Sequence, residues 1–403
     1  MDTLFLAFAA LLMVAVLISE RAHRTVLSTA VLFLVGGFLL GPGVLDLIAL
    51  QPGDPLVGQL AELALFAVLF TDGMKAGIRE LRSAWRLPGR ALLLGLPLTL
   101  IITAVIAHLL LDLTWTQTFL LAAVLAPTDP VFAAAIVGRE EVPRRLRHLL
   151  NVESGVNDGL ALPVVLVLLA AAGGAQTGGW LLLEEIVLGV VIGVAVPWVV
   201  LRLERLPALA AQAAFQPLVT ISIALLVLAL CLITHGNLFL GAFAAGVTVA
   251  STGPTFREEF EQVGELVTEL LKLAAILVFG VLMTPDFLFQ EIPAVGWIFA
   301  VAALLVARPI ALALAFVGAH LSWREQGVAM WFGPKGFASV VYGLIVLESG
   351  APDADLLFHL VALVVVLSIL AHSSTDVLIA RNFAGPPDAW DEPTGEEQAT
   401  RPD

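Results

Sequence analysis

Charged residues and cysteine are scarce in this chain. Asp, Glu, Lys and Arg together make up 13% of the 403 residues, whereas hydrophobic residues make up 59%. A soluble domain carries about 25% charged residues. The composition therefore excludes a soluble domain and predicts an all-α polytopic membrane protein. The single cysteine, Cys231, excludes an internal disulfide, and we interpret it as a small residue of the core.

Other absences exclude classes of function. No strongly basic run indicates nucleic-acid binding, no glycine-rich loop indicates ATP as an energy source, and no spacing of His and Cys indicates a metal cofactor. We therefore expect no cofactor. The amino terminus lacks the charge order of a signal peptide, because Arg21 and Arg24 follow its apolar run instead of preceding it.

Apolar windows of about 20 residues mark membrane-spanning helices. They predict thirteen transmembrane helices, over residues 3–20, 26–49, 57–74, 90–111, 116–138, 147–172, 180–202, 214–234, 236–252, 265–284, 292–320, 326–348 and 355–380. The polar, proline-rich residues 381–403 are predicted to form a short disordered tail.

The basic residues determine the predicted orientation. With the amino terminus outside, seventeen of the twenty Lys and Arg residues fall in inner loops or in the tail, and none falls in an outer loop. The other three, Lys272, Arg308 and Lys335, lie inside apolar windows. Because positive residues favour the cytoplasmic side, we expect a cell-membrane protein with its amino terminus outside and its carboxyl terminus in the cytoplasm.

Two of the windows are interrupted near their middle. The fifth contains Ala126-Pro127-Thr128-Asp129-Pro130 and the twelfth contains Phe332-Gly333-Pro334-Lys335-Gly336. Each is the fifth of six helices if helices 1–6 and 8–13 form two inverted repeats, and discontinuous helices 5 and 12 would then cross at mid-membrane. Paired breaks of this kind indicate the substrate site of a transporter. Ordinary proline kinks are the alternative, but each break also carries a charge.

Four further polar residues lie in the sixth window: Glu153, Ser154, Asn157 and Asp158. Charges inside a bilayer are costly and usually serve function. Helical spacing places Ser154 and Asp158 on one stripe, where their hard oxygens suit a small cation together with Asp129 and the freed carbonyl of Thr128. A protonated Asp158 that only holds helices together is the structural alternative.

The neighbouring stripe, with Glu153 and Asn157, suits a structural network. We expect Glu153 to pair with Arg308, because an unpaired arginine at that depth would be costly. The three acids Asp129, Glu153 and Asp158 against Arg308 and Lys335 leave one negative charge. One monovalent cation or one proton would neutralise it, which predicts competition and electroneutral, one-for-one exchange. We also expect Lys335 to favour the ionised form of Asp129.

These motifs resemble the monovalent cation/proton antiporters of the NhaP and animal sodium/proton exchanger kind over essentially all thirteen helices. The residues that carry the resemblance are Thr128-Asp129-Pro130, Glu153-Ser154 with Asn157-Asp158, Arg308-Pro309, Gly333-Pro334-Lys335-Gly336 and the basic stretch at 142–147.

The resemblance implies a secondary transporter, not an enzyme, that exchanges Na⁺, Li⁺ or K⁺ for H⁺ and serves pH homeostasis. Asp158 would be the shared ion and proton site, Asp129, Ser154 and Thr128 would be co-ligands of Na⁺, and Asn157, Glu153, Arg308 and Lys335 would support the site.

It further implies a homodimer that works by an elevator motion. The dimerisation part would comprise about 1–74 and 214–284, and the moving core about 90–172 and 292–380. The Asn157-Asp158 pair resembles the pair found in the electroneutral branch of these antiporters. Two segments depart from the pattern. Lys335 replaces an arginine. Phe70-Thr71-Asp72-Gly73-Met74 stands where relatives often have Phe-Glu-Gly-Gly-Leu, and its Asp72 is either a funnel acid or a helix cap.

Lys272 and His148 are weaker candidates. We expect Lys272 to pair locally with Glu269, three residues away on the same helix. A dimer-interface role is the alternative for Lys272. His148 suits a solvated loop better than a pH sensor.

Two other classes of function would use the same acids. Asp129 and Asp158 could share a proton as in an intramembrane aspartyl protease. That enzyme's Gly-x-Gly-Asp pattern is absent, however, and Lys335 would have no role in it. A cation channel is the second alternative, but inverted repeats around one midplane site favour alternating access.

Overall fold

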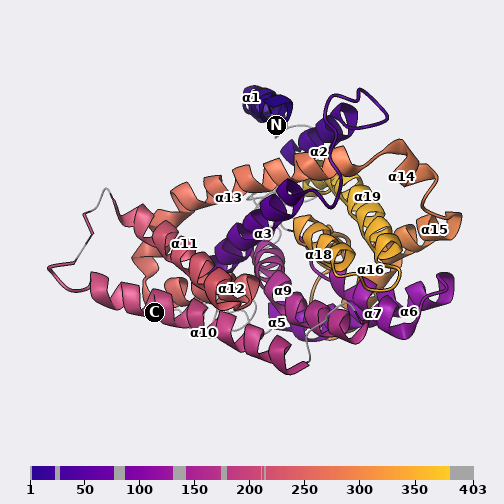
Figure 1. Ribbon diagram of the computed structural model, residues 1–403. Coiled ribbons are helices and arrows are strands. Elements are labelled where there is room, and N and C mark those ends of the chain that lie inside the picture. Colours follow the sequence, from indigo (N-terminus) through magenta and orange to yellow (C-terminus); the bar gives the residue numbers. More distant parts are fainter. Residues whose placement is uncertain are drawn as a thin grey trace.

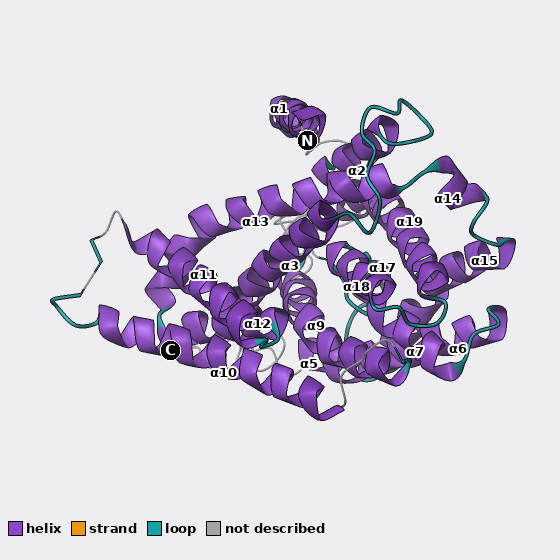
Figure 2. Cartoon of the chain, viewed as in Figure 1, coloured by secondary structure: helices purple, strands orange, loops and turns teal. Residues whose placement is uncertain are grey.

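A computed structural model describes residues 2–22, 28–76, 87–129, 142–173, 179–209, 211–212 and 215–381. Every regular element in these ranges is helical (Figure 2). The first part contains α1 (Asp2–Ala22), α2 (Thr29–Leu40), α3 (Pro55–Lys75), α5 (Leu87–Arg90), the π-helical turn η1 (Ala91–Gly95), α6 (Leu96–Leu110), α7 (Trp115–Val124), α9 (Arg144–Ala171) and α10 (Gly179–Glu204).

The second part continues with α11 (Gln216–Thr234), α12 (Leu238–Thr252), α13 (Pro254–Leu282), α14 (Pro285–Phe289), α15 (Ala294–Ala302), the π-helical turn η4 (Ala303–Ala307), α16 (Arg308–Ala315), α17 (Trp323–Trp331), α18 (Phe337–Glu348) and α19 (Ala354–Arg381). Five basic residues predicted to lie in inner loops, at positions 24, 79, 82, 86 and 139, are outside the described residues. So are Pro130 and the tail from 382 onward.

Within the described ranges, seven helical segments are long and apolar enough to cross a membrane. Five shorter apolar helices, among them α7 and α18, coincide with further apolar windows. The chain is therefore an all-helical polytopic membrane protein, as its composition predicted. The total of thirteen spanning helices and the inverted repeats stay predictions.

The helices pack in two groups that share a central contact region. In the first, α3 packs against α12 and α13, α13 also packs against α2, and α10 and α11 pack against α12. In the second, α6 packs against α7 and α16, α7 against α9, and α18 against α19. The central helices α3, α9 and α18 contact one another and connect the groups (Figure 1).

The closest helix contact explains a pair of glycines. Gly73 of α3 and Gly246 of α12 face each other, and a Cβ on Gly246 would collide with the backbone carbonyl of Phe70. Small residues let two helix backbones approach closely inside a membrane protein. This contact fixes α3, and with it Asp72, beside the centre of the molecule.

In both interrupted windows, the chain is not helical at the proline- and glycine-containing segment, as the sequence predicted. Helix α7 ends at Val124, and residues 125–129 are not helical. Residues 332–336 separate α17 from α18. The two breaks meet directly, because the backbone N–H of Asp129 donates to the carbonyl oxygen of Pro334 at 2.8 Å. The fold thus brings Thr128 and Asp129 into contact with a segment about 200 residues later in the chain.

Candidate functional site

Asp129 lies where the two breaks meet and is 95% buried, with 5% of its surface exposed. Its Oδ2 accepts from the backbone N–H of Phe337 at 3.3 Å, and Phe337 is the first residue of α18. The amino end of a helix carries a partial positive charge, and Oδ2 of Asp129 lies against the amino end of α18. Gly336 makes the approach possible, because a Cβ there would overlap the Asp129 side chain.

The second partner of Asp129 is Lys272 of α13. The Lys272 ammonium donates to Oδ1 of Asp129 at 3.3 Å, and both side chains are buried. The local pair with Glu269 predicted from the sequence is therefore wrong. Helical spacing alone pointed to Glu269, whereas burial turns Lys272 towards a carboxylate that lies 143 residues earlier in the chain.

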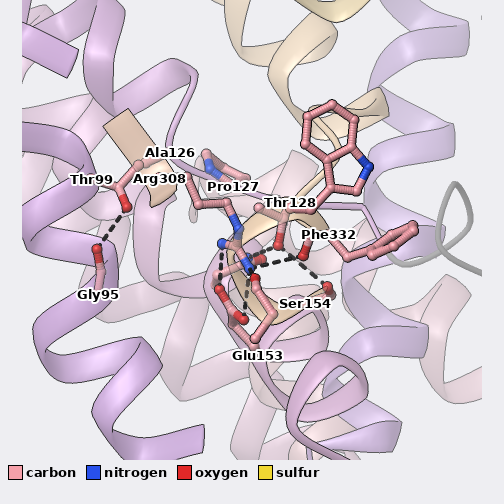
Figure 3. A network of polar contacts seen from close by, with 12 residues as sticks. Gly95, Thr99, Ala126, Pro127, Thr128, Glu153, Ser154, Arg308 and Phe332 are labelled. Carbon is pink, nitrogen blue, oxygen red and sulfur yellow. Dashed lines mark hydrogen bonds and ion pairs between the residues drawn. The ribbon is translucent and has the colours of Figure 1, made fainter. Parts of the chain in front are cut away.

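Thr128 connects the first break to α9. Its Oγ1 accepts from Nδ2 of Asn157 at 2.6 Å and lies 3.3 Å from Oγ of Ser154 (Figure 3). The structure thus brings Thr128 and Ser154 together, which the sequence grouped in one site, and adds Asn157, which the sequence placed in a separate structural network. These contacts use the Thr128 hydroxyl, and a ligand role for the Thr128 carbonyl stays a prediction.

Asp158 lies one helical turn after Ser154 on α9 and is buried. Its Oδ1 has no hydrogen-bond partner within the described part of the chain. Its backbone carbonyl accepts from the Tyr342 hydroxyl of α18 at 2.9 Å. A buried carboxylate oxygen without a protein partner is costly, and a bound cation or proton offsets that cost.

Glu153 and Arg308 form the ion pair that the sequence predicted. Nη1 of Arg308 donates to Oε1 at 2.6 Å and Nη2 donates to Oε2 at 3.0 Å, a two-point geometry that fixes both side chains (Figure 3). Nη2 also donates to the carbonyl of Phe332 at 3.0 Å, where α17 has just ended. Arg308 follows the π-helical turn η4, and such turns often mark functional sites.

Lys335 contacts the backbone carbonyls of the first break and not the Asp129 side chain. Its ammonium donates to the carbonyls of Ala126 and Pro127 at 3.2 and 3.4 Å, and its N–H donates to Oγ of Ser368 at 2.6 Å. These carbonyls follow the end of α7, where a positive charge is favourable. We expected Lys335 to be the cation that stabilises Asp129; the cation that contacts Asp129 is Lys272.

Asp72 is buried inside α3, three residues before the helix ends. The interpretation as a helix-end cap is wrong, since the backbone carbonyl of Asp72, not its side chain, accepts the N–H of Ala76. Its Oδ2 has no partner within the described residues. A role as funnel acid stays a prediction. His148 is exposed near the start of α9, so it lies on a helix and not in the expected loop, and no contact within the described residues assigns it a role.

The structure adds two charged residues to the buried cluster but leaves its net charge unchanged. Among the described residues, the buried charged side chains around the two breaks are Asp72, Asp129, Glu153 and Asp158 against Lys272, Arg308 and Lys335. The two added residues, Asp72 and Lys272, carry charges of opposite sign. Four acids and three bases again leave one negative charge, which is the quantity that a monovalent cation or a proton would neutralise.

Fold and site together define a helical membrane protein of the transporter class, with two interrupted segments that meet at a buried cluster of charges. The chain belongs to the sodium/hydrogen exchanger family, because the model of that family's transmembrane domain matches residues 8–380. This result confirms the resemblance seen in the motifs. Nothing in it favours a protease or a channel.

Individual relatives agree with the family. The chain is 27% identical over 396 residues to a protein named K(+)/H(+) antiporter NhaP2 from Shewanella oneidensis, with 94% of this chain and 67% of the relative aligned. It is 27% identical over 366 residues to the K(+)/H(+) antiporter NhaP of Alkalimonas amylolytica, covering 89% of this chain and 62% of that protein. The chain thus spans about two thirds of the length of these relatives.

Among solved structures, the sodium proton antiporter MjNhaP1 from Methanocaldococcus jannaschii has the same fold. The TM-score is 0.75 at 17% sequence identity, and the match covers 95% of this chain and 98% of the other.

Proposed function

We propose that this chain is a secondary antiporter that exchanges one monovalent cation for one proton. The observation that carries the proposal is Oδ1 of Asp158, a buried carboxylate oxygen that has no partner among the described residues and lies one turn from Ser154 on α9. Carboxylate and hydroxyl oxygens are hard ligands that suit a small cation. Asp158 would bind the cation and the proton in turn, with Asp129, Ser154 and Thr128 as further ligands.

The stoichiometry follows from the charges. With one net negative charge around the breaks, the site becomes neutral with either a cation or a proton. A site that is neutral in both loaded states moves no net charge in a full exchange cycle. We therefore propose electroneutral exchange, with Glu153, Arg308, Asn157 and Lys335 holding the site in shape.

For the transport movement, we propose an elevator in a homodimer. The two packing groups support this idea, since α2, α3 and α10–α13 pack among themselves, as do α6, α7, α9 and α15–α19. The second group carries the breaks and would move; the first would contain the dimerisation part. Na⁺ is the first candidate cation, followed by K⁺, which the names of two relatives contain, and Li⁺.

The test uses purified protein in liposomes that enclose a pH-sensitive dye. Addition of Na⁺, K⁺ or Li⁺ outside should drive protons across the membrane in the wild type, and Asp158→Asn should abolish the signal. Asp355→Asn is the matched control, because Asp355 is an exposed acid at the start of α19. Undiminished exchange in Asp158→Asn would contradict the assignment of the ion site, and absence of cation-driven proton movement in the wild type would contradict the antiporter itself.

A further inference from the structure

Among the described residues, Lys272 and Asp72 are the buried charges around the breaks that the proposed exchange cycle does not use, and Lys272 contacts the site directly. It belongs to α13, which packs against α2 and α3, whereas its partner Asp129 belongs to the break after α7. The ion pair of 3.3 Å therefore connects the two packing groups. Any movement of one group relative to the other has to break it.

Contacts along α3 and α13 set the position of Lys272. The hydroxyls of Thr71 and Thr268 lie 2.9 Å apart, one helical turn below Lys272 on α13. One turn lower still, the ammonium of Lys75 lies 3.0 Å from Glu265. These contacts join α13, which carries Lys272, to α3.

The acidic side chains around Lys272 stabilise its buried ammonium group. Its ammonium interacts with Asp129, and the charges of Glu269 and Asp72 also act on it. Only Asp129 is at hydrogen-bonding distance within the described chain. The ammonium group thus occupies one carboxylate oxygen of a residue that, in the proposed function, is a ligand of the transported cation.

We propose that Lys272 is a built-in competitor of the transported cation. In the cation-free protein its ammonium group occupies Oδ1 of Asp129, and an incoming monovalent cation has to displace it. Lys272 then sets the cation affinity and joins the two packing groups until a cation binds. This inference rests on the proposed antiport but adds a residue that determines affinity and lies outside the ion-binding cluster.

The decisive experiment measures the half-saturating cation concentration in the liposome assay for Lys272→Met. Without its competitor, the cation should bind more tightly, and the half-saturating concentration should fall by about tenfold, the change that one charge-assisted hydrogen bond supports. The matched control is Lys75→Met, which removes a positive charge from the same series of contacts at a partly exposed pair. It should stay within about twofold of the wild type.

Thermal unfolding supplies a readout that a merely structural bridge would not change. A cation that replaces the missing ammonium should raise the unfolding temperature of Lys272→Met more than that of the wild type at the same concentration. Lys272→Gln keeps a donor for Asp129 and repeats both measurements if Lys272→Met does not fold. Variants that stay unfolded at saturating cation contradict the inference, because the cation should substitute for the lost charge.

The failures of the two proposals are distinguishable. If both Lys272 variants keep the wild-type half-saturating concentration while the wild type exchanges cations for protons, the competitor role is wrong and the antiport stands. If the wild type moves no protons in response to any of the three cations, the proposed function is wrong and the competitor role falls with it.

Discussion

The backbone N–H of Asp129 and the carbonyl oxygen of Pro334 form a 2.8 Å hydrogen bond between the two interrupted segments. Neither group is part of a regular helix, so each break supplies the partner that the other lacks. The charged side chains complete the arrangement, since Lys335 donates to the carbonyls that follow α7 and Asp129 accepts from the first N–H of α18. Irregular backbone inside a membrane protein is tolerated only where it is satisfied in this way.

Loss of one member of the Glu153–Arg308 pair should destabilise the protein strongly. Glu153→Gln leaves a buried guanidinium without its carboxylate, which costs about 3–5 kcal/mol. The double variant Glu153→Leu/Arg308→Met leaves no unpaired charge and should lose less than the two single changes together. Thermal unfolding in detergent measures the effect, with Glu184→Gln on the exposed face of α10 as control. Additive losses would show that the pair does not act as a unit.

Gly336 should tolerate no side chain. Because a Cβ would overlap the Asp129 side chain, Gly336→Ala has to push the carboxylate away from α18. We expect a loss of about 1–3 kcal/mol and an increased half-saturating cation concentration. Gly327→Ala is the control: nothing lies within 4 Å of a Cβ on this exposed position of α17, and alanine favours the helix. Equal behaviour of the two variants would contradict the close contact.

The sequence was most informative at polar residues whose burial in a membrane costs free energy. Asp129, Glu153, Asp158 and Arg308 stand out in apolar windows, and the need to pair a buried arginine predicted its contact with Glu153. Lys272 stood out as well, but its partner lies 143 residues away and no local spacing indicates it. Lys335 uses backbone carbonyls, which every residue possesses and which a sequence therefore does not distinguish.

Helix boundaries show the same division between local and distant causes. The proline- and glycine-rich segments at 126–130 and 332–336 indicated both breaks, because backbone donors and conformational freedom are local properties. Each π-helical turn ends two residues before a proline, Pro97 after η1 and Pro309 after η4, and proline lacks the N–H of a regular helical hydrogen bond. The packing of η1 against α16 and of η4 against α6, in contrast, joins residues far apart in the chain and has no local signal.

Glu325 should make stability depend on acid pH. It precedes the apolar window 326–348, and both Nε and Nη2 of Arg145 donate to it, as does the backbone N–H of Ser322. Burial raises its pKa, but the hydrogen bonds from Arg145 and Ser322 outweigh burial, so that the pKa lies below its ordinary value of 4.5. A carboxylate with a lowered pKa stabilises the fold above pH 4.5, and this contribution is lost as the pH falls through the folded-state pKa.

The difference in unfolding temperature between wild type and Glu325→Gln should therefore be constant from neutral pH down to about pH 5 and shrink in stronger acid. Arg145→Gln serves as the partner control and should show the same trend. A difference that grows on acidification would contradict a lowered pKa for Glu325.

Exchange should be insensitive to membrane potential. Among the described residues, the buried charged side chains at the breaks that belong to the proposed moving group are Asp129, Glu153, Asp158, Arg308 and Lys335, which sum to one negative charge. A bound cation or proton neutralises it, so no net charge crosses the membrane in either direction of the cycle. A single uncompensated charge would couple to the potential by about 2.3 kcal/mol per 100 mV, which would change the driving force visibly.

The measurement imposes potentials of both signs on liposomes by means of an ionophore for an ion that the protein does not transport. The initial rate and the final pH difference should be equal at both signs, and addition of a protonophore should confirm that the dye responds. Acceleration at one sign and slowing at the other would contradict one-for-one exchange. It would mean that unequal numbers of cations and protons are exchanged in each cycle.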